Sequence, residues 1–120
     1  MKINIISYGT KYHEYINCDI LIDARSLKNP YYQEELKEYS GLDNRVSYFL
    51  WKDSYTKEYL ESIMLMIDLY LENISTKLNE ITIAVKCTGG MHRSVFIANY
   101  LYKELKDAHD VNIKHLDLID

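Results

Sequence analysis

Apolar residues recur along this chain in two patterns, as short β-branched runs and as longer stretches with helical spacing. The short runs predict four strands, which are residues 3–7, 19–24, 81–86 and 111–115. Polar or glycine-containing connections bound each of them. Because two stretches with helical spacing alternate with these strands, the pattern predicts an α/β domain with a small, mainly parallel sheet of about four strands flanked by helices.

The first predicted helix lies between the second and third strands. Its apolar residues recur at intervals of three and four, which is one helical face: Leu60, Ile63, Ile67, Leu71, Ile74 and Leu78. Asp53 and Ser54 are suitable N-cap residues, and Asn73 or Ser75 weakens the second half. The second helix is predicted over 93–106. Residues 25–52, with the single proline and a turn signal at 40–43, are predicted to be ordered but irregular.

The connection between the third strand and the second helix carries candidate chemistry. Residues 87–94 read Cys-Thr-Gly-Gly-Met-His-Arg-Ser. A loop that leads into a helix presents unpaired backbone N–H groups, and the helix dipole adds partial positive charge there. Arg93 adds a planar guanidinium that fits two phosphate oxygens. The pattern predicts a phosphate-binding loop, and the alternative for Arg93 is a structural ion pair with Asp23.

Composition narrows the classes of partner. A chain of 120 residues is long enough for one domain, expected over 1–120, and its net charge of −4 disfavours broad attraction to nucleic acid. Two cysteines, Cys18 and Cys87, and the absence of a leader-like start are typical of a protein of the reducing cytoplasm. No apolar stretch reaches the length of a membrane span, so no membrane partner is expected. Cysteine and histidine spacing indicates no metal site, and no cofactor is expected.

Five separated segments resemble one known family. They are residues 6–12, 19–25, 29–30, 41–43 and 87–95, and the motif Cys-Thr-Gly-Gly-x-His-Arg-Ser-Val in the last of them is unusual by itself. In this order they resemble the C-terminal domain of the RNase adapter protein RapZ, over nearly the whole chain. In that family a P-loop nucleotide-binding domain precedes this one. No Gly-x-x-x-x-Gly-Lys-Ser/Thr motif occurs here, so we expect a stand-alone domain.

The resemblance implies a regulatory domain that senses glucosamine-6-phosphate, binds small RNA and presents it to an endoribonuclease, usually as a homo-oligomer. By position, Thr88, Gly89 and Arg93 match the phosphosugar site, and the neighbouring motif supplies three more candidates, Asp23, Arg25 and Asn29. The remaining expected ligand-binding residues are Tyr31, Gly90, His92 and Ser94. Lys11 matches a basic position expected to contact RNA, whereas residues 116–120 make the end of this chain acidic.

Two other functions fit the same residues. Cys87, Gly90 and Arg93 match Cys-x-x-Gly-x-x-Arg followed by Ser94, which resembles the phosphate-binding loop of cysteine-dependent protein tyrosine phosphatases. Cys87 would then be the nucleophile and Arg93 the phosphate clamp. The candidate acids for that reaction are Asp23, Asp43, Asp53 and His92, although a histidine in this place more often caps or orients a loop. The third hypothesis is an oligomeric protein-interaction module.

Overall fold

Four parallel strands form one sheet with the order β2-β3-β1-β4. The computed structural model describes residues 1–118, so Ile119 and Asp120 of the acidic end lie outside the described residues. The elements in chain order are β1 (Lys2–Gly9), β2 (Ile20–Asp23), the 3₁₀ turn η1 (Pro30–Tyr32), α1 (Asn44–Trp51), α2 (Ser54–Ile74), β3 (Glu80–Cys87), α3 (Arg93–Leu105) and β4 (Asp110–His115). The predicted α/β class and the four predicted strands are confirmed.

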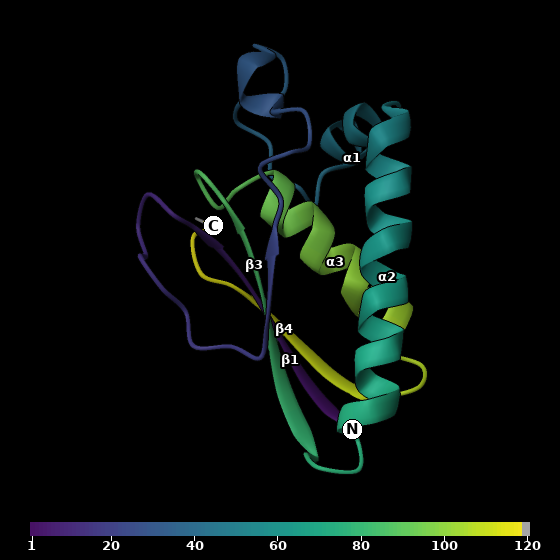
Figure 1. The fold of residues 1–120 in the computed structure, drawn as a ribbon. Helices are drawn as coiled ribbons and strands as arrows, with labels where there is room; N and C mark the ends of the chain where they lie inside the picture. Colours follow the sequence, from purple (N-terminus) through teal and green to yellow (C-terminus); the bar gives the residue numbers. More distant parts are fainter. Residues whose placement is uncertain (119–120) are drawn as a thin grey trace.

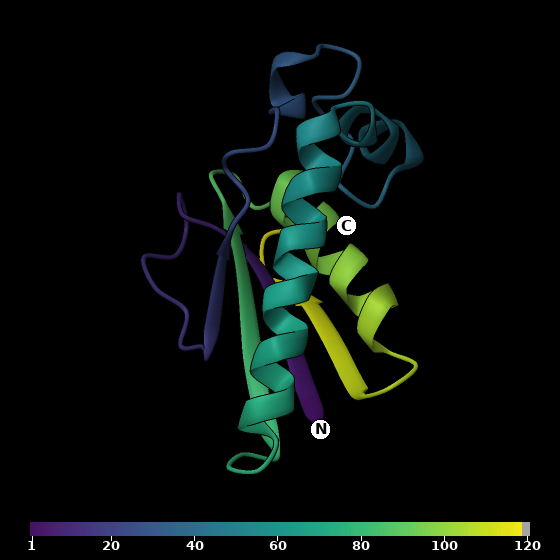
Figure 2. The same ribbon diagram turned by 45° about the vertical axis from the view of Figure 1, so that its right-hand side comes forward.

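The helices cover one face of this sheet, as Figures 1 and 2 show. The connections from β2 to β3 and from β3 to β4 run in the same direction across the sheet. Because such crossovers are right-handed, both place their helices on the same side. The apolar residues of β1 and β3 on this side are fully buried, among them Ile5, Ile83 and Val85, and α3 contributes Ile97 and Leu101 to the same core.

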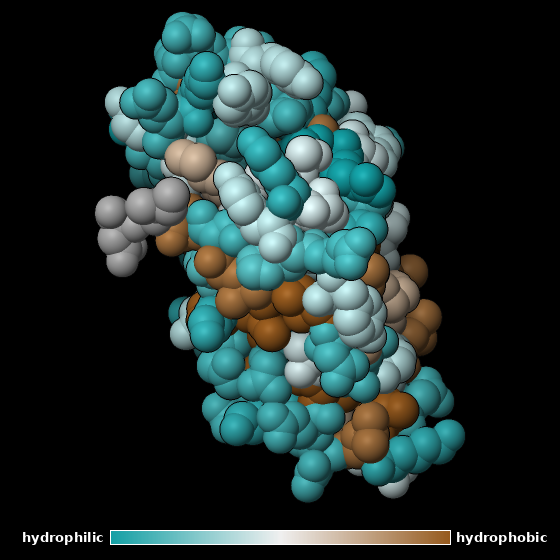
Figure 3. All heavy atoms as spheres, turned by 90° about the vertical axis from the view of Figure 1, so that its left-hand side faces the viewer, coloured by the Kyte–Doolittle hydropathy of each residue, from teal (hydrophilic) through white to brown (hydrophobic). Residues whose placement is uncertain are grey.

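The opposite face of the sheet carries residues 10–19, which lead back from β1 to β2 (Figure 1). Parallel sheets are usually covered on both faces. Here Tyr8 and Ala84 are buried on this side, but Leu21 of β2 is exposed. Figure 3 shows hydrophobic atoms gathered in the middle of this side of the molecule, between polar margins. The molecule therefore has one fully packed layer of helices and one partly open face.

Helix α2 begins where its caps predict and ends earlier than its apolar pattern predicts. Asp53 is the N-cap, and its carboxylate accepts a hydrogen bond from the Tyr55 backbone N–H at 3.2 Å. The helix ends at Ile74, so the inclusion of Leu78 in its apolar face was wrong, and Leu78 is exposed after the last turn. The Asn73 side chain donates to the Leu69 carbonyl at 2.8 Å, which is typical of a residue that competes with the helix backbone.

Residues 25–52 hold a helix that the sequence pattern did not predict. The Asp43 carboxylate caps α1 by accepting from the Arg45 backbone N–H at 2.9 Å. Only Val46 and Leu50 are buried in this helix. Two apolar residues one turn apart are too short a pattern to separate a helix from an irregular segment. None of the helices in the described part of the chain is long and apolar enough to cross a membrane.

Candidate anion-binding site

Three parallel strands end side by side at one edge of the sheet, and the loop after β3 lies there. Gly9 pairs with Cys87, and Asp23 pairs with Lys86. Beyond these pairs, the Thr10 N–H donates to the Cys87 carbonyl at 2.8 Å and the Lys11 N–H donates to the Thr88 carbonyl at 3.1 Å. The loop at 88–92 is therefore joined to the segment after β1. Ligands of open parallel sheets bind at the carboxyl ends of the strands, where this loop lies.

The loop turns through Gly90, which has a φ of +73°. A β-carbon at Gly90 would lie 2.5 Å from the Gly9 nitrogen, and one at Gly9 would lie 2.6 Å from the Gly89 carbonyl carbon. A β-carbon at Gly89 would meet no atom of residues 1–118 within 4 Å. Glycine is therefore required at Gly90 and Gly9 by backbone conformation and close approach, whereas Gly89 borders open space.

The Cys87 thiol sits beneath this turn and is buried. It donates to the Ser94 hydroxyl at 3.1 Å and accepts from the Gly90 backbone N–H at 3.2 Å. These two contacts connect the end of β3 to the first turn of α3. Within residues 1–118, the backbone N–H groups of Gly89, Met91 and His92 donate to no protein atom. They are the N–H groups available to an anion at this helix N-terminus.

Arg93 is the most unusual side chain of this region, since it is 6% exposed and has no carboxylate partner within residues 1–118. Its Nη1 donates to the backbone carbonyls of Arg25 at 2.8 Å and Leu27 at 3.2 Å. Its Nε and Nη2 make no hydrogen bond to the described residues. The guanidinium is thus held by one nitrogen, and its other N–H groups remain available for a ligand.

The expected alternative partner of Arg93, Asp23, pairs with Arg25 instead. Arg25 donates through Nη2 to Asp23 Oδ2 at 2.8 Å and through Nε to Asp23 Oδ1 at 2.9 Å. The Arg25 guanidinium holds the pKa of the Asp23 carboxyl below its usual range. The hypothesis of an Arg93–Asp23 ion pair was therefore wrong, because a residue two positions along the chain already occupies that carboxylate.

A cavity of about 390 Å³ opens above the loop. Its lining residues are Lys11, Tyr12, Asn29, Tyr31, Tyr32, Lys37, Cys87, Thr88, Gly89, Met91, His92 and Arg93. Most of the predicted ligand-binding residues are in this set. The exceptions are Asp23 and Arg25, which pair with each other, and Gly90 and Ser94, which contact Cys87 beneath the loop.

Sequence reasoning missed Lys37 and Met91 as cavity residues. Lys37 comes from the segment after η1, and its Nζ lies 4.9 Å from the centre of the Tyr31 ring. It brings a third cation to the cavity besides Lys11 and Arg93. No carboxylate is among the described residues that line this cavity. Nothing in the local sequence separates Lys37 from the other lysines, so only the path of residues 33–40 places it here.

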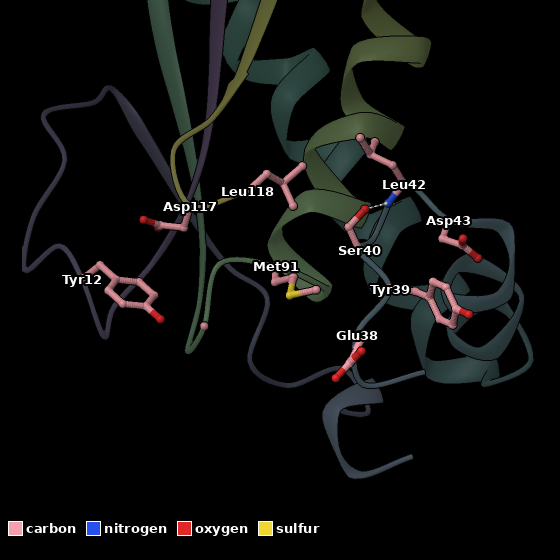
Figure 4. A pocket seen from close by; sticks show the side chains of 10 residues that line it. Tyr12, Glu38, Tyr39, Ser40, Leu42, Asp43, Met91, Asp117 and Leu118 are labelled. Atoms are coloured by element: carbon pink, nitrogen blue, oxygen red, sulfur yellow. Dashed lines mark hydrogen bonds between the residues drawn. The ribbon is translucent and has the colours of Figure 1, made fainter. Parts of the chain in front are cut away.

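A second cavity of about 550 Å³ adjoins the first and has the opposite character (Figure 4). The two share Tyr12, Gly89 and Met91 as a common wall, and the second has three carboxylates, Glu38, Asp43 and Asp117. Arg45 donates to Asp43 and lowers the pKa of that carboxyl to about 2. Phosphate would be repelled here, so the charges direct an anion to the smaller cavity.

Asp117 belongs to the acidic end of the chain, and its carboxylate makes two polar contacts with β1 and the segment after it. Its carboxylate accepts from the Gly9 N–H at 2.7 Å and lies 3.0 Å from His13 Nε2. It also packs against Gly90. This carboxylate therefore holds Gly9 and His13 in place next to the loop at 88–92. The sequence did not indicate this role.

His92 occupies the N-cap position of α3, and its side chain makes no capping hydrogen bond to the described residues. Of the two supporting roles expected for it, capping is therefore wrong, and orienting the loop stays a prediction. Burial lowers its pKa, although the carbonyls of residues 36, 37 and 39 partly offset this. A second histidine, His115, also has its pKa lowered by burial, and its Nδ1 lies 2.6 Å from the Ser7 hydroxyl. Both rings are therefore neutral more readily in the folded chain than in the unfolded chain.

Acidification is expected to destabilise the protein through these two histidines. Below about pH 6.5 the unfolded chain binds their protons more readily than the folded chain, so the free energy of unfolding falls with pH. Asp23 and Asp43 have lowered pKa values, so their contribution to the free energy of unfolding is lost only below about pH 4. Urea unfolding at pH 7.5 and 5.0 should show the loss, and it should shrink when both His92 and His115 are changed to Gln. Equal stability at both values would contradict this account.

The fold and the cavity together define a class of protein: a small parallel α/β domain with a cavity lined by cationic side chains at the carboxyl ends of its strands. Comparison with known families is more specific. The family model described as the RapZ C-terminal domain matches residues 1–119. The chain belongs to the RapZ C-terminal domain family.

Relatives of this chain are longer proteins. A nucleotide-binding protein of Clostridium botulinum is 40% identical over 120 residues, which are 98% of this chain and 41% of that protein. Nucleotide-binding proteins of Bacillus cytotoxicus and Bacillus thuringiensis are 38% and 37% identical over 118 residues, again 98% of this chain and 40% of theirs. The chain thus spans about two fifths of the length of these relatives, and the nucleotide binding in their names belongs to the whole proteins.

Proposed function

We propose that this chain acts as a RapZ-type regulatory domain that binds a phosphorylated small molecule in the cavity above residues 88–92. The observation that carries the proposal is the environment of Arg93. A buried guanidinium without a carboxylate is unfavourable unless an anion or carbonyl groups compensate its charge. Two carbonyls hold one nitrogen, and the remaining N–H groups match the oxygens of a phosphate.

The electrostatics of the cavity support a ligand with more than one negative charge. Lys11 and Lys37 line it together with Arg93, and the free backbone N–H groups of the loop add partial positive charge. The chain as a whole is negative, at −4. A local concentration of cations in an acidic protein favours a small anion over an extended polyanion.

The adjoining acidic cavity supports an aminosugar phosphate as the ligand class. Glu38 lines it and has no ion-pair partner within residues 1–118. Tyr12, Gly89 and Met91 line both cavities, so the cavities lie side by side, and one ligand would have to extend past these residues to contact both. Glucosamine-6-phosphate, which the family resemblance implies, carries a phosphate and an ammonium group on one ring. Its phosphate would meet Arg93 and its ammonium group would face the acidic side.

RNA and a ribonuclease are the further partners that the resemblance implies, and they rank second in this proposal. Lys11, the expected RNA contact, lines the cavity and is exposed beside Thr88. A single lysine supplies little of the phosphate neutralisation on which RNA affinity depends. The cavity residues therefore support the small ligand more strongly than they support RNA.

Hydrolysis by Cys87 is the alternative that the Cys87–Ser94 contact favours, because a hydroxyl and a backbone N–H beside sulfur stabilise a thiolate. A phosphatase also needs an acid that protonates the leaving oxygen. Of the four candidates, Asp23 and Asp43 are paired with arginines and Asp53 caps α2. His92 is in the cavity, but burial lowers its pKa and reduces its protonated fraction. Binding without turnover is therefore the favoured function.

The test is calorimetric titration with glucosamine-6-phosphate, glucose-6-phosphate, glucosamine and inorganic phosphate. We expect glucosamine-6-phosphate to bind most tightly and glucosamine alone to bind weakly or not at all. Lys37→Glu should lower the affinity for the phosphorylated ligands by at least about tenfold, since it reverses one charge of the cavity. Lys77→Glu makes the same charge change beyond α2, at the opposite end of β3, and should leave affinity unchanged.

Three results would contradict the proposal. No heat with any phosphorylated ligand at millimolar concentration would exclude this site as a phosphate sensor. Equal effects of the Lys37 and Lys77 variants would show that binding lies elsewhere. Release of inorganic phosphate from the ligand, lost in Cys87→Ser, would replace binding by hydrolysis as the function.

A further inference from the structure

The direction of the Arg93 guanidinium is set by the turn that follows β2. The two carbonyls that accept from Arg93, those of Arg25 and Leu27, both belong to this turn. The Leu27 N–H closes the turn by donating to the Ala24 carbonyl at 3.2 Å. Because a guanidinium is planar, the carbonyls that hold its Nη1 also decide where Nε and Nη2 point. The place of the turn therefore determines the direction of the free N–H groups of Arg93.

The inner side of this turn is fixed to the sheet. The Ala24 N–H donates to the Lys86 carbonyl of β3 at 2.8 Å, which extends the pairing of β2 with β3 by one residue. Ala24 and Leu27 are buried, so their side chains hold the turn against the core. The two residues between them, Arg25 and Ser26, are exposed. The sheet thus leaves the outer side of the turn to contacts from elsewhere.

Helix α2 supplies the contacts on the outer side. Its N-terminal half lies at the end of the sheet where β2 ends, as Figures 1 and 2 show. The Tyr59 hydroxyl donates to the Asp23 carbonyl, directly before the turn, and the Tyr55 hydroxyl donates to the Ser26 hydroxyl at 2.9 Å. The two tyrosine rings are stacked, with their centres 5.6 Å apart and their planes at 18°. One helical turn of α2 therefore holds the turn after β2 at two points.

From these contacts we infer that Tyr59 is a positioning residue of the phosphate site, which acts on the ligand through the turn after β2 and Arg93. The inference rests on the proposed function, because it assigns a support to the same guanidinium. Tyr59 is not among the described residues that line the cavity, so its effect on a ligand there is indirect. A displaced turn would redirect the free N–H groups of Arg93, and hydrogen bonds to phosphate weaken when their direction is wrong.

Tyr59 is the most protected of the supports on this side. It is half-buried, and its contact with the Asp23 carbonyl is partly buried, whereas the Tyr55–Ser26 contact is exposed. The ion pair of Asp23 with Arg25 is exposed too, and exposed ion pairs contribute little. Burial raises the pKa of Tyr59, so its hydroxyl remains a donor at neutral pH. Loss of this hydroxyl should therefore loosen the turn more than loss of either exposed contact.

NMR of the arginine side chains tests this role, because the chain has three arginines, Arg25, Arg45 and Arg93. Their Nε–H signals are assigned with Arg25→Lys and Arg45→Lys. In the protein without ligand, Tyr59→Phe should shift the Arg93 signal and speed the exchange of its Nε–H with water by at least about threefold, because a loosened turn opens more often. The Arg45 signal should stay unchanged, since that side chain is paired with Asp43.

Titration with inorganic phosphate then measures the effect on the site. Tyr59→Phe should raise the Kd for phosphate by about three- to tenfold, which is the usual effect of one hydrogen bond. Tyr70→Phe is the matched control, because Tyr70 lies in the same helix, is partly buried, and has no hydrogen bond from its hydroxyl to the described residues. It should leave both the Arg93 signal and the affinity unchanged.

Four outcomes are decisive. An Arg93 signal that is the same in Tyr59→Phe and in the wild type would overturn the inference. Equal effects of the Tyr59 and Tyr70 variants would also overturn it, since they would indicate a general loss of packing. A lower melting temperature of Tyr59→Phe with unchanged affinity would assign the hydroxyl to stability alone. Failure of phosphate to move the Arg93 signal of the wild type would instead contradict the proposed function, and the spectra without ligand would still decide whether Tyr59 positions Arg93.

Discussion

Arg93→Ala is expected to weaken the binding of inorganic phosphate and glucosamine-6-phosphate by about 100-fold. The change removes the two nitrogens that are free to donate, Nε and Nη2, together with the positive charge, and each charge-assisted hydrogen bond contributes about 1.5–3 kcal/mol. A loss of about 3 kcal/mol corresponds to about two orders of magnitude in Kd. The variant also frees the carbonyls of Arg25 and Leu27, so its fold must be checked by circular dichroism. Calorimetric titration measures the affinity.

Two further variants separate binding from folding. Arg93→Gln removes the charge but keeps more of the buried side-chain volume than alanine does, so it should fold better than the alanine variant and still bind poorly. Arg25→Ala removes an exposed guanidinium that pairs with Asp23 and does not line the cavity, so it should retain affinity within about threefold. Equal losses in Arg93→Ala and Arg25→Ala would show that the ligand is not held by the buried guanidinium.

Gly90→Ala is expected to lower the free energy of unfolding by about 2–4 kcal/mol. A positive φ costs a non-glycine residue about 1–2 kcal/mol. The added β-carbon would also lie 2.5 Å from the Gly9 nitrogen and 2.8 Å from Asp117 Oδ2. The first of these neighbours is backbone in a strand, so the clash must be relieved by moving the loop, at a cost of about 1–3 kcal/mol. Urea unfolding at pH 7.5 measures the change.

Gly89→Ala is the matched control for this prediction. It adds the same methyl group one residue earlier, where none of the described residues comes within 4 Å, so the free energy of unfolding should change by no more than about 1 kcal/mol. The methyl group enters the cavity, and phosphate affinity should therefore fall. Equal destabilisation by the two changes would show that the loop does not depend on the conformation of Gly90.

The candidate site was only partly predictable from the sequence. The loop at 88–92 and Arg93 follow from local pattern, because a strand, a glycine turn and a helix must adjoin each other in the chain. Asn29 and Tyr31 were predicted through the family resemblance, and the structure places both in the cavity wall. Lys37 was missed because no local spacing connects it to Arg93. The Arg93–Asp23 ion pair was wrong for the same reason: local spacing does not show that Arg25 pairs with the Asp23 carboxylate instead.

The helices and strands were also only partly predictable from the sequence. The β-branched runs predicted all four strands, and Asp53 correctly marked the start of α2. Helix α1 was missed because only Val46 and Leu50 face the core, and their burial depends on packing against other elements. Leu78 was wrongly included in α2 because an apolar residue at helical spacing carries no information about where the backbone leaves the helix.

Local patterns in the sequence are sufficient to predict the α/β class, the four strands, the two longer helices and the loop that leads into α3. These features depend on residues close together in the chain, where periodicity, caps and glycine act directly on the backbone. Three other features depend on the tertiary structure: Arg93 has no carboxylate partner among residues 1–118, Lys37 lies with Lys11 in the same cavity, and β4 is the last strand of the sheet. These depend on which distant segments pack together, and that is set by the free energy of the whole core.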